Sequence, residues 1–161
     1  MDREGIVNIT VVYDSIYGNT AKVAAVIAAA LEGDNSVRLL SVQEARQADL
    51  GTADLLIVGS PTRGFRPTPQ ISDLLAGLAP RSAGAAAAVF DTRIEPAAVR
   101  PGALRWVVER GGYAGSRMDE VLRDRGYVRQ GEIAGFLVNG MKGPLKPGEI
   151  ERAADWARSL L

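Results

Sequence analysis

IVNITVVYDSIYGNT, residues 6–20, passes from an apolar, β-branched run into a short loop rich in hydroxyl and amide groups. Its first part, residues 6–13, has the length and composition of a buried strand. The stretch that follows, AKVAAVIAAAL at 21–31, favours a helix, and Gly33 is suited to end that helix. The loop between the two elements consists of Ser15, Ile16, Tyr17, Gly18, Asn19 and Thr20.

A loop between a strand and a helix N-terminus collects backbone N–H groups, and the helix dipole adds a partial positive charge there. An anion such as a phosphate is therefore the ligand that this loop favours. The alternative is an ordinary turn in which Asn19 or Thr20 caps the helix, because both residue types are common in caps and turns.

Composition narrows the possible chemistry. The 19 basic and 19 acidic residues of this 161-residue chain cancel, so no nucleic-acid partner is expected. Cysteine and histidine are absent, which excludes disulfides, thiolate metal sites, a cysteine nucleophile and the Ser–His–Asp triad. We therefore predict no catalytic side chain and no metal site, and we expect a bound cofactor to supply any chemistry.

The first strand pattern begins almost at the start of the chain and leaves no room for a signal peptide. The longest apolar run, residues 23–31, is far shorter than the about 18 residues of a membrane span. We expect one cytoplasmic domain, residues 1–161, that does not enter a membrane.

Strand and helix patterns alternate along the chain. Strands are predicted at 6–13, 37–42, 55–58, 85–90 and within 127–139, where the signal is strongest at 135–138. Helices are predicted at 21–31, 44–50, 70–78, 103–110 and 116–125, with Ser116 as a cap, and from about Pro147 onward. This alternation predicts an α/β fold with helices on both faces of a parallel sheet, and a ligand beyond the carboxyl ends of its strands. The loops at that edge are 14–20, 59–69 and 91–101.

Several nucleotide-binding classes do not fit these loops. The first loop lacks the Gly-x-Gly-x-x-Gly of dinucleotide sites and the Gly-Lys-Ser/Thr of a P-loop. A response-regulator receiver needs an acidic pair after the first strand and an aspartate at the end of the third. Here Asp14 stands alone, and the third strand ends in Gly59-Ser60. A phosphate held by hydroxyls and amides, without a lysine, remains.

At this point the chain resembles the flavodoxin family, which binds FMN. The first loop fits the family pattern Ser/Thr-x-Ser/Thr-Gly-x-Ser/Thr except at Tyr17, and GSPTRG at 59–64 resembles the family's second flavin loop. The segment 91–93 (DTR) resembles the start of the third flavin loop, and GPLKPGE at 143–149 looks like the close of short bacterial flavodoxins. The resemblance covers about residues 6–161.

The resemblance implies a three-layer, doubly wound, five-stranded parallel sheet in the order 2-1-3-4-5. It implies FMN near the first loop, with Thr62 close to the phosphate. It also implies that the Gly64 carbonyl can turn to accept a hydrogen bond from reduced flavin N5. The cofactor-binding residues that it implies are Ser15, Ile16, Tyr17, Gly18, Asn19, Thr20, Ser60, Pro61, Thr62, Arg63, Gly64, Phe65, Asp91, Thr92 and Arg93.

Three departures from the family pattern keep other functions open. Tyr17 resembles the Ser-x-Tyr-Gly loop of flavodoxin-like quinone reductases. Arg63 stands where many flavodoxins place a tryptophan. Either Phe65, two residues later, takes the place of the tryptophan, or Arg63 stacks on the ring through its planar guanidinium. The segment 91–93 is followed by prolines instead of a tyrosine, so Trp106 or Tyr113 is the candidate to cover the other face of the ring.

The leading expectation is a one-electron carrier with non-covalent FMN, a reductase as donor, an acceptor enzyme, and a monomeric or weakly dimeric state. The alternatives are an FMN-dependent NAD(P)H or quinone oxidoreductase and a flavodoxin-like interaction module without flavin. Arg63, Arg66 and Arg93 are expected at the flavin edge, where positive charge favours the anionic reduced form and raises the reduction potential. An acidic redox partner is a second expected consequence of these arginines.

Overall fold

The computed structural model describes residues 6–81, 84–94 and 113–161, in which strands and helices alternate. The elements are β1 (Asn8–Tyr13), α1 (Asn19–Leu31), β2 (Ser36–Ser41), α2 (Val42–Ala45), the 3₁₀ helix η1 (Leu50–Thr52), β3 (Leu55–Pro61), α3 (Pro69–Ala76), β4 (Ala86–Ile94), α5 (Ala114–Asp124), β5 (Val128–Arg129), β6 (Ala134–Val138) and α6 (Glu149–Ser159). No helix in these ranges combines the length and the apolar character needed to cross a membrane.

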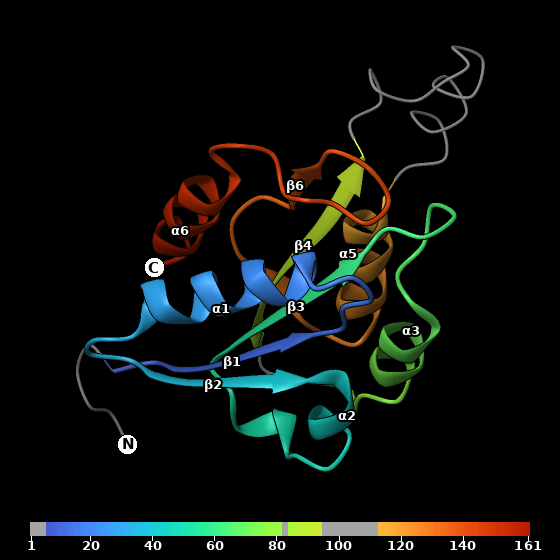
Figure 1. Ribbon diagram of the computed structural model, residues 1–161. Coiled ribbons are helices and arrows are strands. Elements are labelled where there is room, and N and C mark those ends of the chain that lie inside the picture. Colours follow the sequence, from blue (N-terminus) through green and yellow to red (C-terminus); the bar gives the residue numbers. More distant parts are fainter. Residues whose placement is uncertain (1–5, 82–83, 95–112) are drawn as a thin grey trace.

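The strands form one parallel sheet in which β1 pairs with β2 and β3, and β3 pairs with β4. Both β5 and β6 then pair with β4, so together they occupy the fifth position. The predicted order 2-1-3-4-5 is confirmed. The switch point of such a sheet lies between β1 and β3, whose carboxyl ends converge at one edge (Figure 1).

The predicted fifth strand is interrupted. Ala87 is opposite Arg129 and Phe90 is opposite Ala134, so two residues of β4 face the four residues 130–133. Within this insertion Gly131 has φ +73°, a conformation that glycine adopts without strain. The sequence pattern alone does not reveal this break, because apolar residues continue on both sides of it.

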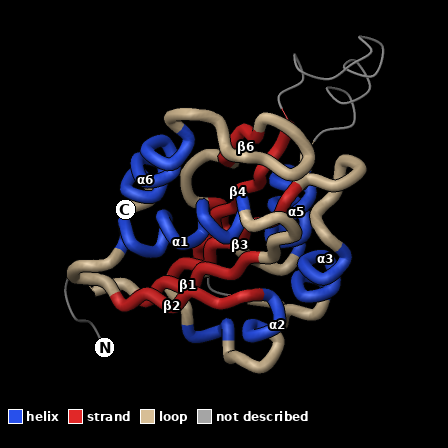
Figure 2. The backbone as a smooth tube through the Cα atoms, viewed as in Figure 1, coloured by secondary structure: helices blue, strands red, loops and turns tan. Residues whose placement is uncertain are grey.

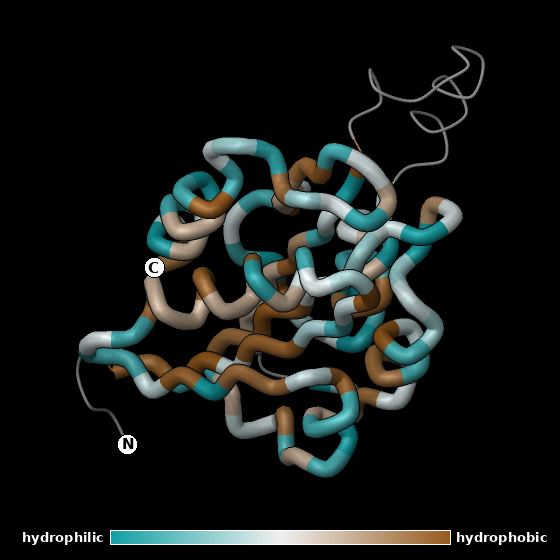
Figure 3. Tube along the Cα trace, in the orientation of Figure 1, coloured by the Kyte–Doolittle hydropathy of each residue, from teal (hydrophilic) through white to brown (hydrophobic). Residues whose placement is uncertain are grey.

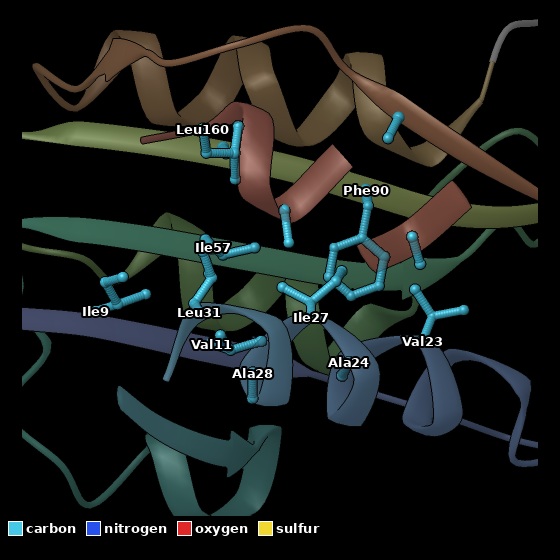
Figure 4. Packing of buried hydrophobic residues seen from close by; sticks show 14 of the residues in the cluster. Ile9, Val11, Val23, Ala24, Ile27, Ala28, Leu31, Ile57, Phe90 and Leu160 are labelled. Atoms are coloured by element: carbon cyan, nitrogen blue, oxygen red, sulfur yellow. The ribbon is translucent and has the colours of Figure 1, made fainter. Parts of the chain in front are cut away.

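Two hydrophobic cores lie on opposite faces of the sheet. Figure 2 shows helices on both sides of the strands, and Figure 3 shows hydrophobic residues along the strands. In β1, Ile9 and Val11 pack on the side of α1 and α6, whereas Val12 packs on the side of α2, α3 and α5. Figure 4 shows the first core, with Ile27 of α1 close to Phe90 of β4. Successive strand side chains point to opposite faces, and together the cores produce the predicted three layers.

Some predicted boundaries are wrong. The strand predicted at 85–90 continues to Ile94, so 91–93 belongs to β4 and not to a turn. The helix predicted at 44–50 is replaced by α2 and η1, because Ser41 forms a capping box with Glu44 and starts α2 two residues earlier.

The predicted cap at Ser116 is also wrong, since α5 begins at Ala114 and Ser116 lies inside the helix. Asn19 and Thr20 do not cap α1 either, because Gly18 occupies the N-cap with φ +96°. The predicted helix 103–110 and its residue Trp106 lie outside the described residues.

Candidate functional site

A cavity of about 440 Å³ opens at the carboxyl edge of the sheet, where β1, β3, β4 and β6 end. It is lined by Ser15, Ile16, Tyr17, Asn19, Thr20, Pro61, Thr62, Arg63, Gly64, Phe65, Thr92, Arg93, Ile94, Tyr113, Val138 and Met141. The structure therefore brings residues from all three predicted loops together around one space. Its volume is within the range usual for small-molecule and cofactor sites.

The first loop is organised around the Ser15 hydroxyl. Its oxygen accepts hydrogen bonds from the backbone N–H groups of Gly18 at 3.1 Å and Ala21 at 3.3 Å. The next N–H groups, those of Asn19 and Thr20, belong to the first turn of α1, where helix geometry provides no intrahelical acceptor. The loop therefore places donors and the positive end of a helix dipole beside the cavity.

Hydroxyl groups connect the first loop to the ends of β3 and β4. Thr20 and Thr92 share a buried hydrogen bond of 2.8 Å between their Oγ1 atoms. The Thr62 N–H donates to the Thr92 carbonyl at 2.9 Å, which continues the pairing of β3 and β4 beyond Pro61. This end of the cavity is thus a cluster of threonine side chains, a polar environment that suits a phosphate.

The second loop folds back on itself as a tight hairpin. Arg63 and Arg66 exchange backbone hydrogen bonds of 2.8 and 3.0 Å, and the turn between them is Gly64-Phe65. Both turn residues have positive φ, +56° for Gly64 and +69° for Phe65, as a type I′ turn requires. Glycine adopts this conformation freely, whereas for phenylalanine it costs about 1 kcal/mol.

Ser60 does not line the cavity; instead it holds the residues that flank this hairpin. Its side chain is fully buried, donates to the Pro61 carbonyl at 2.9 Å and accepts from the Thr68 N–H at 3.0 Å. Thr68 in turn caps α3 by accepting from the Ile71 N–H. Ser60 therefore fixes both ends of the second loop.

Arg93 and Asp91, at the end of β4, form a bidentate ion pair. The guanidinium donates from Nε to Oδ1 at 2.6 Å and from Nη2 to Oδ2 at 2.7 Å. Its Cζ lies 3.7 Å from the centre of the Tyr113 ring. A Cβ on Gly135 would lie 2.2 Å from the same guanidinium carbon, so a larger residue there would displace Arg93 from this position.

Asp91 is completely buried and does not line the cavity. Burial raises the pKa of its carboxyl above the ordinary 3.8, while the Arg93 side chain and the Gly115 N–H act in the opposite direction. The sequence groups Arg93 with Arg63 and Arg66 as cations at the edge. The structure separates them, because the charge of Arg93 is offset by Asp91.

The N-terminus of α5 is capped by side chains from the other two loops. The Ala114 N–H donates to Thr62 Oγ1 at 3.0 Å, and the Gly115 N–H donates to Asp91 Oδ2 at 2.8 Å. These contacts fix the preceding Tyr113, whose half-buried ring lines the cavity. Two aromatic residues are candidates to cover the other face of the flavin ring. Tyr113 lies at the cavity, and Trp106 is outside the described residues.

Four lining residues are absent from the predicted set of cofactor-binding residues: Ile94, Tyr113, Val138 and Met141. Val138 ends β6, and Met141 lies in the turn after it. The loop 139–143 reaches the cavity because the Asn19 side-chain amide donates to the Lys142 carbonyl at 3.2 Å. A search of the strand ends for apolar residues, extended to the fifth strand, would have found this segment.

The cavity combines a polar end with apolar walls. Hydroxyls and helix N–H groups gather where α1 begins, whereas Ile16, Phe65 and Tyr113 supply flat or branched apolar surface elsewhere along its lining. A ligand with a phosphate at one end and an aromatic ring system at the other fits this distribution of groups.

Comparisons with known proteins agree with this geometry. Residues 10–90 match the family model described as a flavodoxin domain. The structure of oxidised flavodoxin 1 from Bacillus cereus has a TM-score of 0.72 at 18% identity, covering 95% of this chain and 96% of that one. Flavodoxin 2 from the same organism has a TM-score of 0.70 at 23% identity, with 95% and 97% covered. Identities this low show the shared fold alone.

Rubredoxin oxygen:oxidoreductase from Desulfovibrio gigas matches 95% of this chain with 35% of its own length, at 19% identity and a TM-score of 0.66. No curated protein matches the chain in sequence.

Proposed function

This chain belongs to the flavodoxin family, and on that premise we propose that it binds FMN non-covalently and carries single electrons between redox proteins. The expected donor is a reductase and the expected acceptor an enzyme, both in the cytoplasm. Bound FMN supplies the redox chemistry, while the protein holds it and sets its electrostatic surroundings. The observation that carries the proposal is the one cavity at which the loops after β1, β3 and β4 meet.

The first loop is proposed to hold the phosphate. The N–H groups of Asn19 and Thr20 and the α1 dipole supply positive potential, and Ser15 keeps the loop in shape through its bonds to Gly18 and Ala21. Thr62, whose hydroxyl also accepts from Ala114, lies on the neighbouring wall. Because no lysine is needed, the exposed Lys22 is assigned no role.

The second loop is proposed to respond to the redox state through the peptide between Gly64 and Phe65. Rotation of this peptide changes ψ of Gly64 and φ of Phe65 together, and it takes Phe65 out of its positive φ of +69°. Gly64 tolerates either arrangement. The carbonyl of Gly64 then becomes available as an acceptor on the cavity side, so the strain at Phe65 favours the change.

FMN binding is tested by titrating the protein with FMN and with riboflavin and following the quenching of flavin fluorescence. FMN should bind at least about tenfold more tightly, because a phosphate at a helix N-terminus gains charge-assisted hydrogen bonds. Ser15→Ala should weaken FMN binding and leave riboflavin binding nearly unchanged. Ser36→Ala, the same change at an exposed position of β2, is the matched control. Equal affinities for both flavins would contradict a phosphate site in the first loop.

The one-electron role is tested by stepwise anaerobic reduction of the FMN-loaded protein, followed by its visible spectrum. A stable one-electron-reduced flavin supports a carrier. Direct two-electron bleaching, together with turnover of NAD(P)H and quinones, would favour the oxidoreductase instead. Failure to take up FMN would leave the interaction module.

A further inference from the structure

A pair of arginines lies in the hairpin beside the cavity, and one of them, Arg63, lines it. Arg63 and Arg66 are directly opposite each other in the hairpin, hydrogen-bonded through both backbone N–H groups, and both are exposed. Residues in such a pair have Cα atoms about 5.5 Å apart and point their side chains to the same face. The hairpin therefore presents two positive charges side by side.

This arrangement is unfavourable for the isolated protein, because like charges directly opposite each other destabilise a strand pair. Within the described residues, neither arginine forms an ion pair. Asp14, which precedes the lining residue Ser15, is half-buried and accepts a hydrogen bond from the Ser15 N–H at 2.9 Å. Among the residues that the structure describes, no carboxylate relieves the repulsion between the two arginines.

A third cation and three exposed apolar residues lie around the same cavity. Lys142 is exposed, and its Nζ lies 5.9 Å from the centre of the Tyr17 ring. Ile16, Tyr17 and Met141 are also exposed, with 48%, 43% and 65% of their surface accessible. We call the six residues Arg63, Arg66, Lys142, Ile16, Tyr17 and Met141 the basic rim.

Exposed acidic residues gather at the other edge of the sheet. Glu32 and Asp34 follow α1, and Asp54, which accepts from the Asn8 N–H at 2.8 Å, precedes β3. Because the formal net charge of the chain is zero, attraction to a charged partner depends on this local distribution and not on the total. A negatively charged surface is therefore drawn toward the basic rim.

We propose that the basic rim docks an acidic surface of the redox partner, whose carboxylates pair with Arg63 and Arg66 while an apolar side chain covers Ile16, Tyr17 and Met141. This proposal rests on the proposed function, because it assigns the partner of the same site. Mixed basic and apolar character suits a transient interface, in which charge sets the encounter rate and a small apolar centre holds the complex.

The test measures binding of a fluorescein-labelled peptide of eight glutamates by fluorescence anisotropy, with the protein saturated with FMN so that the cavity itself is filled. A labelled octalysine peptide controls for the sign of the charge. Arg63→Gln/Arg66→Gln is compared with Arg123→Gln/Arg158→Gln, which removes the same charge from the exposed ends of α5 and α6.

Wild-type protein should bind octaglutamate more tightly than octalysine, and added salt should weaken the binding. The rim variant should lose about three- to tenfold in affinity, as expected for two exposed ion pairs. The control variant should stay within about twofold of wild type. Equal losses in both variants, or a preference for octalysine, would overturn the docking proposal.

FMN affinity measured in the same samples separates this proposal from the proposed function. Normal FMN binding with no octaglutamate preference would reject the acidic partner alone. If FMN does not bind, the proposed function fails, whatever the peptide does. Tight binding of inorganic pyrophosphate that depends on Arg63 and Arg66 and excludes octaglutamate would instead identify the pair as a small-anion site and overturn docking.

Discussion

Two pairs of charged residues flank the same cavity and differ in almost every physical respect. Asp91 and Arg93 have opposite charges, are held in a bidentate contact and are largely enclosed. Arg63 and Arg66 have the same charge, pair only through their backbones and are exposed. The first pair fixes the position of Tyr113 and α5, whereas the second creates a positive potential in front of the cavity.

The difference shows that burial and ion pairing determine whether an arginine contributes to stability or to the electrostatic field at the cavity. Burial and a fixed partner make Arg93 a structural residue with little net field, because Asp91 compensates its charge. Exposure makes Arg63 and Arg66 nearly irrelevant to folding, and no described carboxylate forms an ion pair that would offset their field. Substitutions at the two places should therefore change different measurable quantities.

The largest expected effect is on stability. Arg93→Gln leaves the Asp91 carboxylate buried without its cation, and removing one partner of a buried pair costs about 3 kcal/mol of unfolding free energy. Arg63→Gln/Arg66→Gln should change that free energy by no more than about 0.5 kcal/mol. Urea denaturation followed by circular dichroism measures both. Similar stabilities for the two variants would remove the distinction between the pairs.

The cost of Arg93→Gln should depend on pH. Burial raises the pKa of Asp91 above 3.8, so the folded protein binds this proton more tightly than the unfolded chain does. The stability of the protein therefore declines as pH rises from the unfolded-state pKa of Asp91 to its folded-state pKa. Without Arg93 the folded pKa rises further. The folded-state pKa of Asp91 is therefore lower in wild type than in Arg93→Gln. As pH rises from the first value to the second, the variant loses stability relative to wild type, and it recovers this stability as pH falls.

Urea titrations repeated from pH 7 to pH 4 measure this dependence. Asp91→Asn/Arg93→Gln, in which the carboxylate is replaced by a neutral amide, should show no such pH dependence. A cost of Arg93→Gln that stays constant over this range would mean that Asp91 does not hold the charge that Arg93 compensates.

The second pair should be visible in the flavin reduction potential of the FMN-loaded protein. In water, an exposed arginine stabilises a negative charge about 8 Å away by about 0.5 kcal/mol, or about 20 mV for a one-electron step. Arg63→Gln/Arg66→Gln should therefore lower the potential, more at low salt than at high salt. Asp91→Asn/Arg93→Gln removes no net charge and should leave it unchanged. An unaltered reduction potential in Arg63→Gln/Arg66→Gln would contradict the proposed electrostatic effect of the basic rim.

The smallest expected effect is the stability change when Arg66→Glu gives the exposed pair opposite charges, like those of Asp91 and Arg93. Arg66→Glu places opposite charges across the hairpin, and a favourable cross-strand pair should add about 0.5 kcal/mol of stability. Arg66→Gln removes the repulsion without adding attraction and should fall between this variant and wild type. Thermal unfolding at low salt resolves the series, and the order should collapse when salt is raised.

The parts of the fold that follow from local pattern are predictable from the sequence. Alternation of apolar strands and helices gives the layers, and the resemblance of the first two loops to flavodoxins gives the strand order. Ser15, Thr20 and Thr62 line the cavity, and the resemblance of the loops 14–20 and 59–69 to flavodoxin loops implies this position.

What the sequence does not reveal depends on contacts between distant segments. The start of α5 is set by Thr62 and Asp91, which lie at other strand ends, so no local cap marks it. The pairing of Arg93 with Asp91 requires the residues 91–93 to be extended, whereas their composition suggests a turn. Met141 is brought to the cavity through a contact between Asn19 and Lys142.

The glycines around the buried ion pair have a consequence for protein engineering. A Cβ at Gly115 would lie 2.9 Å from the Asp91 carboxylate oxygen, and one at Gly135 would lie 2.2 Å from the Arg93 guanidinium. If a recipient sheet of this topology has larger residues at these two places, transplanted Asp91 and Arg93 would therefore have to shift from the positions that they hold here. The pair and its two glycines form one graft, and chimaeras should keep or exchange all four residues together.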